Sequence, residues 1–290
     1  MLPNFVAHRV RYLQTCARVR LTNARDRLMA SPAVSFYDSV STGFDAEAHI
    51  DVLPAYSLIY VSQPKCASTT IKSFLAQLNA QTVQEPVRLH NRRVSGIQSP
   101  AQAGISTFYR IAKNPASLRF SFVRNPFARL VSAWADKFSG KRLDSGDPFV
   151  EQYLSYRRAA GGEPKAASED GVSFAEFARF ASATATQRLN SHWNLQHDLM
   201  DFPGLELNLI GRVENFVADF ARIVERLGPY ARQCAHVATT HHNRSRHSPW
   251  RQYYTPEIVE LVAKAYARDF DQFGYSHQPL TCSGARRRRP

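Results

Sequence analysis

The chain has 290 residues, of which 44% are hydrophobic and 21% are charged, so it is long enough to bury one large core, and one domain of mixed class is expected. Its 37 basic and 24 acidic residues give a formal net charge of +13, which favours an anionic ligand, an anionic polymer or a membrane surface as a partner. Four scattered cysteines without a Cys-x-x-Cys pair argue against a disulfide scaffold or a zinc site, and no apolar run approaches the roughly 18 residues of a membrane span.

Residues 1–50 are predicted to form a basic arm that contains a helix. Five apolar side chains fall near one face of that helix: Val6, Val10, Leu13, Ala17 and Leu21. We expect the helix to dock on the body of the protein. Because the segment is rich in arginine and has no acidic residue before Asp26, a mitochondrial presequence or a helix on a membrane surface is the alternative. A secretory signal is not predicted, since residues 1–30 contain no continuous apolar core.

The first strand-to-helix unit surrounds a loop that is rich in hydroxyl groups. The apolar run Leu58–Val61 predicts a buried strand, and apolar residues recur at helical spacing from Ile71 to Leu78. A strand that enters a helix through such a loop leaves backbone N–H groups unpaired at the helix N-terminus, and Lys65 and Lys72 stand beside them. This arrangement suits a phosphate or a similar anion. The loop is not a Walker A sequence, because it lacks the two glycines and the Gly-Lys-Ser/Thr ending.

Two further strand-to-helix units follow along the chain. Residues 118–124 and residues 205–211 each predict a strand that leads into a helix, and residues 86–90 predict a weaker strand. Strands that alternate with helices indicate a parallel sheet with right-handed crossovers, in which ligands bind beyond the carboxyl ends of the strands. Lys65 and Arg124 both follow such ends, so the sequence places two basic side chains at the ligand-binding edge of the predicted sheet.

A long insertion, about residues 145–200, separates the second unit from the third. Helical patterns at residues 149–158 and 174–183 flank a turn at residues 161–164. An insertion on the ligand-facing edge often shapes the site of a second substrate, and the alternative is a helical pair that caps the core. Residues 279–290 are expected to form a basic, disordered tail.

Two of these segments resemble a known family. The stretch Gln63-Pro-Lys-Cys-Ala-Ser-Thr-Thr-Ile-Lys72 resembles the 5′-phosphosulfate loop of sulfotransferases. The stretch Phe122-Val-Arg-Asn-Pro-Phe-Ala-Arg-Leu-Val-Ser-Ala-Trp134 resembles their 3′-phosphate segment. Three later stretches resemble landmarks of the carbohydrate branch of that superfamily: Ser191-His-Trp-Asn-Leu-Gln196, Gly211-Arg-Val-Glu-Asn-Phe216 and Tyr253-Tyr-Thr-Pro-Glu257. The first two motifs are specific together, because they occur in the right order and each follows a predicted strand.

The resemblance implies a P-loop-like, three-layer α/β fold with a central parallel sheet and a helical insertion, in a domain of residues 51–278. It implies 3′-phosphoadenosine 5′-phosphosulfate (PAPS) as the donor, whose sulfuryl group is transferred to a hydroxyl of a carbohydrate or glycoconjugate. This chemistry needs a positioned acceptor and stabilised charge rather than a metal, so no metal is expected. One departure is that the loop contains no glycine, since Ala67 stands where relatives often have Gly.

The resemblance assigns the 5′ side of the donor to the loop after the first strand. The residues expected to hold it are Lys65, Cys66, Ala67, Ser68, Thr69 and Thr70. Lys65 is the candidate for stabilising charge on the departing bridging oxygen, and Lys72 is the reserve.

The 3′-phosphate of the donor is assigned to the second motif. Arg124 would bind it as a charged fork and Ser132 through its hydroxyl. Arg212 and Arg246 are further candidates for contact with the nucleotide, whereas Arg129 is expected to be a solvated helix residue.

A general base should accept the proton of the acceptor hydroxyl, and histidine suits the pH range. His90 and His192 are the two candidates, and neighbouring Trp193 is an alternative face on which a sugar could stack. A histidine cluster near Cys234 does not predict zinc, because its spacing matches no standard site: His241, His242 and His247.

Three other functions compete with this interpretation. A P-loop nucleotide phosphotransferase or NTPase would need the missing Gly-Lys-Ser/Thr signature and an acidic residue after the strand of residues 118–123 to hold magnesium. A non-enzymatic basic protein that binds nucleic acid or another polyanion would explain the net charge but not the two ordered motifs. A catalytically dead member of the family is the third. The expected partner is a carbohydrate or glycolipid acceptor, not nucleic acid, and peripheral contact with a membrane is compatible with the basic arm.

The resemblance also bears on location. Animal members of this kind are Golgi proteins with an N-terminal membrane anchor, and this chain contains no such apolar segment. We therefore expect a bacterial enzyme of the cytoplasm, with the Golgi lumen as the alternative.

Overall fold

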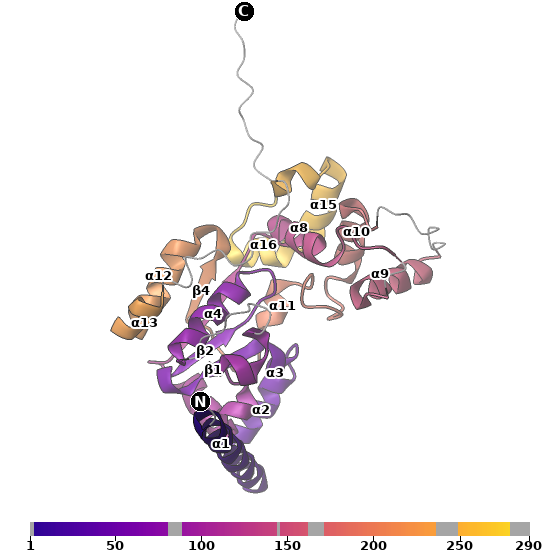
Figure 1. Ribbon diagram of the computed structural model, residues 1–290. Coiled ribbons are helices and arrows are strands. Elements are labelled where there is room, and N and C mark those ends of the chain that lie inside the picture. Colours follow the sequence, from indigo (N-terminus) through magenta and orange to yellow (C-terminus); the bar gives the residue numbers. More distant parts are fainter. Residues whose placement is uncertain (1–2, 81–88, 144–145, 162–170, 236–248, 279–290) are drawn as a thin grey trace, which may run out of the picture. The chain divides into compact units, whose positions relative to one another are not determined.

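The computed structural model describes residues 3–80, 89–143, 146–161, 171–235 and 249–278 (Figure 1). The chain divides into two compact units. The sheet unit comprises Met1–Arg124 and Asp198–Arg244, and the helical unit comprises Asn125–His197 and Ser245–Pro290.

The sheet unit contains, within its described residues, a sheet of four strands in the order β1-β2-β3-β4. The strands are β1 (Ile50–Leu53), β2 (Leu58–Val61), β3 (Leu118–Val123) and β4 (Leu209–Arg212). Strands β2, β3 and β4 are parallel, and β1 pairs antiparallel with β2. Every residue of β1, β2 and β3 is buried, including the polar residues Asp51, Arg119 and Ser121. Only β2 therefore reads as an uninterrupted apolar run, as is typical of a strand buried on both faces. The predicted α/β class is confirmed, with a sheet that is mostly parallel.

One face of the sheet is covered by helices that follow β2 and β4 in the chain. They are α4 (Ser68–Leu78), α12 (Phe216–Leu227) and α13 (Pro229–Cys234), with the short 3-10 turn Val213–Asn215 before α12. Their apolar stripes form one core with the strands, in which the rings of Phe74 and Phe220 lie edge to face at 4.9 Å.

Other helices of the sheet unit precede β3 in the chain. They are α1 (Pro3–Leu28), α2 (Pro32–Ser41), α3 (Ala46–His49), α5 (Arg92–Ser95), α6 (Pro100–Ala103) and α7 (Ile105–Lys113), with a 3-10 turn at Pro54–Tyr56. The predicted N-terminal helix is present as α1. It docks on the unit through Asn23, whose amide donates to the carbonyl of Ala101 and accepts from the N–H of Ile105.

The helical unit packs around aromatic side chains. Its helices are α8 (Pro126–Lys137), α9 (Pro148–Ala159), α10 (Phe174–Thr184), α15 (Pro256–Ala265) and α16 (Ala267–Phe273), with a 3-10 turn at Trp250–Tyr253. Helix α11 (Gln196–Met200) begins in this unit and ends in the sheet unit. Helices α9 and α10 coincide within two residues with the patterns predicted inside the insertion.

One strand prediction differs from the structure in where it starts, and another falls mostly outside the described residues. Strand β4 begins at Leu209 rather than at residue 205, because the segment before it is joined to β3 mainly through side chains, beside one backbone hydrogen bond from Asn208 to Arg119. The Arg119 side chain donates to the carbonyl of Glu206, and the Asn208 amide donates to the carbonyl of Ser117. The weak strand at residues 86–90 falls mostly outside the described residues, and His90 lies in a 3-10 turn.

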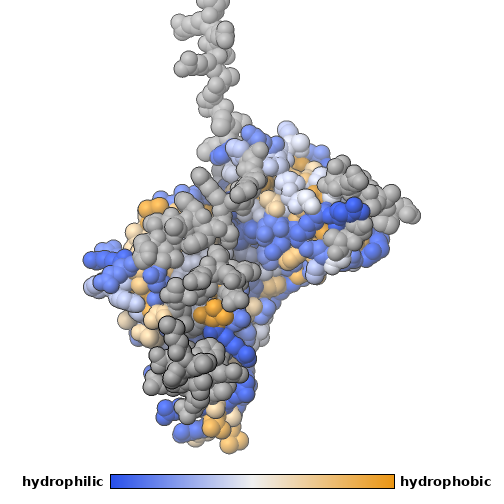
Figure 2. Space-filling model, viewed as in Figure 1, coloured by the Kyte–Doolittle hydropathy of each residue, from blue (hydrophilic) through white to orange (hydrophobic). Residues whose placement is uncertain are grey.

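Among the coloured residues of Figure 2, most of the visible surface is hydrophilic, and hydrophobic side chains occur in scattered patches. Exposed apolar residues on or next to α1 include Leu21, Leu28 and Met29. Among the residues that the structure describes, no helix combines the length and the apolar character that a membrane span requires.

Candidate functional site

The loop between β2 and α4 has an uncommon backbone. Lys65 and Ala67 both have positive φ, at 69° and 61°, although neither is glycine. Cys66 between them is fully buried, and its N–H donates to the carbonyl of Gln63. Alternation of left-handed and other residues turns successive N–H groups toward one side and forms a concave anion site. Ala67 is the N-cap of α4 and has no side-chain oxygen with which to cap the helix, so the local geometry favours an anion at the helix N-terminus.

Arg124 lies next to this loop. Strands β2 and β3 are parallel and pair Val61 with Ser121, so the loop after β2 and the residue after β3 emerge at the same edge of the sheet. The guanidinium of Arg124 donates to the carbonyl oxygen of Lys65 at 3.3 Å. Two motifs that are 59 residues apart in the sequence are thereby joined in the sheet unit.

The other residues predicted for the 5′ side have different surroundings. Ser68, Thr69 and Thr70 form the first turn of α4 and are half-buried, whereas the thiol of Cys66 points into the core. Lys72 is 6% exposed, and its ammonium forms an ion pair with Asp51 at 3.0 Å. Because the charge of Lys72 already has a buried partner, a role for Lys72 in binding the sulfuryl donor remains a prediction.

The predicted 3′-phosphate residues do not all lie in one unit. Ser132 belongs to α8 of the helical unit and is 3% exposed. Arg212 ends β4 with an exposed side chain, and its backbone N–H donates to Asp219. Arg246 falls outside the described residues.

The two candidate bases differ in how firmly they are held. His90 is exposed in the sheet unit, one residue before the N-cap of α5. His192 is half-buried in the helical unit, and its Nδ1 lies 2.8 Å from Oδ1 of Asn190. The amide nitrogen of Asn190 donates to Gln152, so Oδ1 is the acceptor and Nδ1 carries the proton. A neutral His192 therefore keeps the lone pair on Nε2, as a general base requires.

The prediction of Arg129 as a solvated residue is wrong. Its side chain is 1% exposed, and the guanidinium donates to the carbonyls of Asn194 and Ser191, both at 2.7 Å. Residues 126–133 of α8 are all buried, so this helix has no solvent-facing side at that point. The apolar residues on every face of this stretch were the available signal, because an arginine inside a fully buried helix must find acceptors.

The segment that contains His192 is also held by a buried carboxylate. Asp269 of α16 accepts hydrogen bonds from the backbone N–H groups of Gln196, at 2.8 Å, and His197, at 2.9 Å. Burial raises the pKa of the Asp269 carboxyl, while these N–H groups and the charge of Arg129 oppose the rise. Residues 191–197 are thus fixed at one end by a buried cation and at the other by a buried carboxylate.

Trp193 cannot offer a face to a sugar in this structure, contrary to that alternative. It is fully buried, and its ring lies 5.2 Å from the ring of Phe180 and 5.8 Å from that of Phe177. This irregular segment has no periodic pattern of apolar residues, so its sequence does not distinguish an exposed tryptophan from a buried one.

The sequence analysis also missed His49, which is bonded to the start of the loop between β2 and α4, the loop predicted to bind the sulfuryl donor. Its Nδ1 lies 3.0 Å from the carbonyl oxygen of Ser62, and the N–H of Ser62 donates to the carbonyl of His49 at 2.7 Å. Ser62 directly follows β2 and precedes the loop. Burial lowers the pKa of the His49 imidazole, although the hydrogen bond to Ser62 opposes that shift. The neutral ring therefore donates from Nδ1 to the loop.

Metal ligation was not predicted. In the parts of the chain that the structure describes, no group of three His, Cys, Asp or Glu side chains could hold an ion. The cluster of His241, His242 and His247 lies outside those parts, so the absence of a metal remains a prediction.

Comparison with known proteins agrees with these motifs. The profile of the sulfotransferase family matches residues 48–276. Carbohydrate sulfotransferase 14 of Danio rerio is 29% identical over 170 residues, which cover 54% of this chain and 43% of that protein. Carbohydrate sulfotransferase 11 of Mus musculus is 26% identical over 89% of this chain and 76% of that protein. For carbohydrate sulfotransferase 14 of Homo sapiens the identity is 27%, over 78% of this chain and 60% of that protein. No solved structure gives a significant match.

These similarities correct the expected location. The expectation of a bacterial enzyme of the cytoplasm is contradicted, because the similar curated proteins are carbohydrate sulfotransferases of animals. That expectation was drawn from the absence of an apolar anchor, and such an absence does not locate a protein.

Replacing Arg129 by Met should lower the free energy of unfolding by roughly 3 kcal/mol, because two buried carbonyls lose their donor and Asp269 loses a nearby positive charge. Urea denaturation measures this change. The matched control is Arg158→Met, whose exposed side chain should contribute less than about 1 kcal/mol. Equal losses in the two variants would contradict the buried role of Arg129.

The stability of the protein should fall as the pH drops below about 6.5, because the folded state disfavours the charged form of His49. Between the lowered folded pKa and the ordinary value, the unfolded chain binds more protons, so protonation favours unfolding in that window. The variant His49→Gln should lose less stability than the wild type between a pH of about 7.5 and about 5.5, measured from urea midpoints. The same pH dependence in both proteins would show that His49 is not the titrating group.

Proposed function

The chain belongs to the sulfotransferase family, and on that premise we propose that it transfers the sulfuryl group of PAPS to a hydroxyl group of a carbohydrate or glycoconjugate. The observation that carries the proposal is the hydrogen bond between Arg124 and the carbonyl of Lys65. It joins a loop with the backbone geometry of an anion site to a guanidinium suited to a second phosphate.

The donor carries charge on both sides of its ribose, and the two motifs match that distribution. The N–H groups of residues 65–70 and the hydroxyls of the first turn of α4 would hold the 5′-phosphosulfate. Arg124 would hold the 3′-phosphate as a planar fork, with Ser132 as a further donor and Arg212 as a flanking charge.

In the reaction, the acceptor oxygen forms a bond to sulfur while the bond between sulfur and the bridging phosphate oxygen breaks. The charge that develops on this oxygen, in the leaving 3′-phosphoadenosine 5′-phosphate (PAP), would be stabilised by the Lys65 ammonium. The acceptor proton passes to a histidine, either His90 or His192. The ring orientation of His192 supports its candidacy, since Nε2 is the nitrogen that can accept.

The acceptor is proposed to be a carbohydrate, either free or as part of a glycolipid. The support is the similarity to proteins that are named carbohydrate sulfotransferases. The net charge of +13 also favours acceptors that carry negative groups.

Replacing Lys65 by Ala should lower kcat about 100-fold or more, because the leaving oxygen loses its charge stabilisation, while the fold is retained. The assay is transfer from radiolabelled PAPS to a panel of oligosaccharide and glycolipid acceptors, with Lys264→Ala, at an exposed position of α15, as the matched control. A Lys65→Ala protein with full activity would remove that residue from the mechanism. Wild-type protein that transfers no label but hydrolyses ATP with magnesium would favour an NTPase instead.

A further inference from the structure

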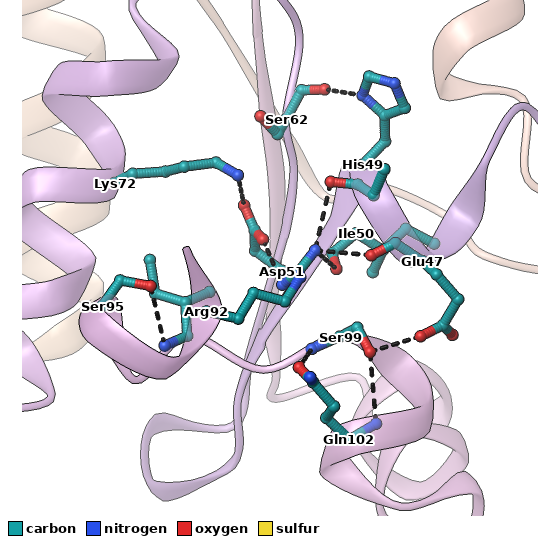
Figure 3. A network of polar contacts seen from close by, with 12 residues as sticks. Glu47, His49, Ile50, Asp51, Ser62, Lys72, Arg92, Ser95, Ser99 and Gln102 are labelled. Atoms are coloured by element: carbon teal, nitrogen blue, oxygen red, sulfur yellow. Dashed lines mark hydrogen bonds and ion pairs between the residues drawn. The ribbon is translucent and has the colours of Figure 1, made fainter. Parts of the chain in front are cut away.

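Asp51 of β1 is a buried carboxylate that contacts two cations from different segments. It is 0% exposed, its Oδ2 lies 3.0 Å from the ammonium of Lys72, and its Oδ1 accepts from the guanidinium of Arg92 at 2.7 Å (Figure 3). Asp51 pairs with Tyr60, the residue before the last one of β2. The carboxylate therefore lies within one residue pair of the strand end from which the donor loop starts.

Lys72 links this carboxylate to α4. Its ammonium comes from the second turn of the helix whose first turn is formed by Ser68, Thr69 and Thr70. The ion pair ties the second turn of α4 to β1.

Arg92 links the same carboxylate to the segment of His90. Besides Asp51, its guanidinium donates to the carbonyls of Glu47 at 2.7 Å, and of Ala48 and Ile50 at 3.2 Å each. These carbonyls belong to α3 and the start of β1. Arg92 is the first residue of α5 and stands two residues after His90, so four oxygens of this region hold the chain next to the candidate base.

Two neutral contacts complete the connection. The amide of Asn79, at the end of α4, donates to the carbonyl of Gly96 at the end of α5 at 2.8 Å. His49 and Ser62 exchange two hydrogen bonds at the root of the donor loop. Residues 47–51 are thus bonded to the donor loop, to α4 and to α5.

We propose that Asp51 is a positioning residue for sulfuryl transfer, which fixes the donor loop through Lys72 and the His90 segment through Arg92. This inference rests on the proposed function. A buried carboxylate with two cations adds little to the free energy of unfolding, since well-packed apolar side chains in the same place often stabilise a fold equally well. Its advantage is a fixed distance between donor and base, because a displacement of about 1 Å at a reacting group can reduce the rate about 100-fold.

The variants Lys72→Met and Arg92→Met test separately the contact of Asp51 with α4 and its contact with the His90 segment. Each leaves Asp51 one cation, so both proteins keep a buried ion pair and should fold. For Lys72→Met we expect affinity for PAP to fall about tenfold, as is typical when outer support of a bound ligand is lost. For Arg92→Met we expect kcat at saturating PAPS to fall about 100-fold, with PAP affinity unchanged. The matched controls are Lys264→Met and Arg93→Met, both at exposed positions, which should change neither quantity.

Arg92→Lys adds a conservative test. The lysine ammonium can pair with the carboxylate of Asp51 but lacks the planar guanidinium that also donates to the carbonyls. Arg92→Lys should therefore have a kcat between those of Arg92→Met and the wild type. PAP affinity is measured by calorimetry and transfer by labelled PAPS at saturating donor, both corrected for the folded fraction.

A purely structural network predicts a different pattern. If Lys72→Met and Arg92→Met lower the melting temperature but keep wild-type PAP affinity and kcat in the folded fraction, the inference is overturned. Losses of kcat and of PAP affinity that are the same in both variants would also contradict the separate roles of Lys72 and Arg92. Wild-type protein that neither binds PAP nor transfers sulfate would instead overturn the proposed function, which distinguishes the two failures.

Discussion

The candidate site depends on the parallel pairing of β2 with β3. That pairing sets Val61 opposite Ser121, so the donor loop and Arg124 leave the sheet at one edge, where the guanidinium reaches the carbonyl of Lys65. A shift of one residue in register would turn the side chains of a strand to the opposite face. Because both strands are fully buried, their packing specifies the register strongly, and the position of the proposed anion site follows from the core.

The loop achieves its shape without glycine. A positive φ at a residue with a Cβ atom costs about 1–2 kcal/mol, and the loop has two such residues, Lys65 and Ala67. The surrounding contacts hold this conformation: Cys66 lies in the core between them, His49 binds the loop root, and Asp51 fixes α4 behind it. The alanine at position 67 therefore adopts the left-handed conformation that glycine would adopt more readily, and strain of this kind is commonly retained at functional sites.

The sequence predicted the strands, helices and anion loop that have local signals. The apolar run of β2 and the helical spacing of α4 depend on neighbouring residues, and both are present in the structure. Strand β1 and its antiparallel pairing were missed, because four residues followed by a turn give too short a pattern. The site residues remain predictions as ligands, although the structure brings Lys65 and Arg124 together.

Buried polar residues were harder to predict than apolar ones. Arg129, Asp51 and Arg92 look like surface residues in the sequence, since charged side chains are usually solvated. Their partners are mostly carbonyls and carboxylates from distant segments, which no local pattern reveals. Trp193 shows the same limit for an aromatic residue. In an irregular segment, the sequence does not indicate whether a tryptophan packs in the core or contacts a ligand.

The most direct test of the account is a cycle that removes the 3′-phosphate from the ligand and the guanidinium from the protein. Affinities of wild-type protein and of Arg124→Ala are measured by calorimetry for PAP and for adenosine 5′-phosphate, which lacks the 3′-phosphate. The account predicts a coupling of about 2 kcal/mol, so that the wild type prefers PAP roughly thirtyfold and the variant shows little preference. If Arg124→Ala retains the full preference for PAP, the 3′-phosphate is bound elsewhere and the proposed donor site is wrong.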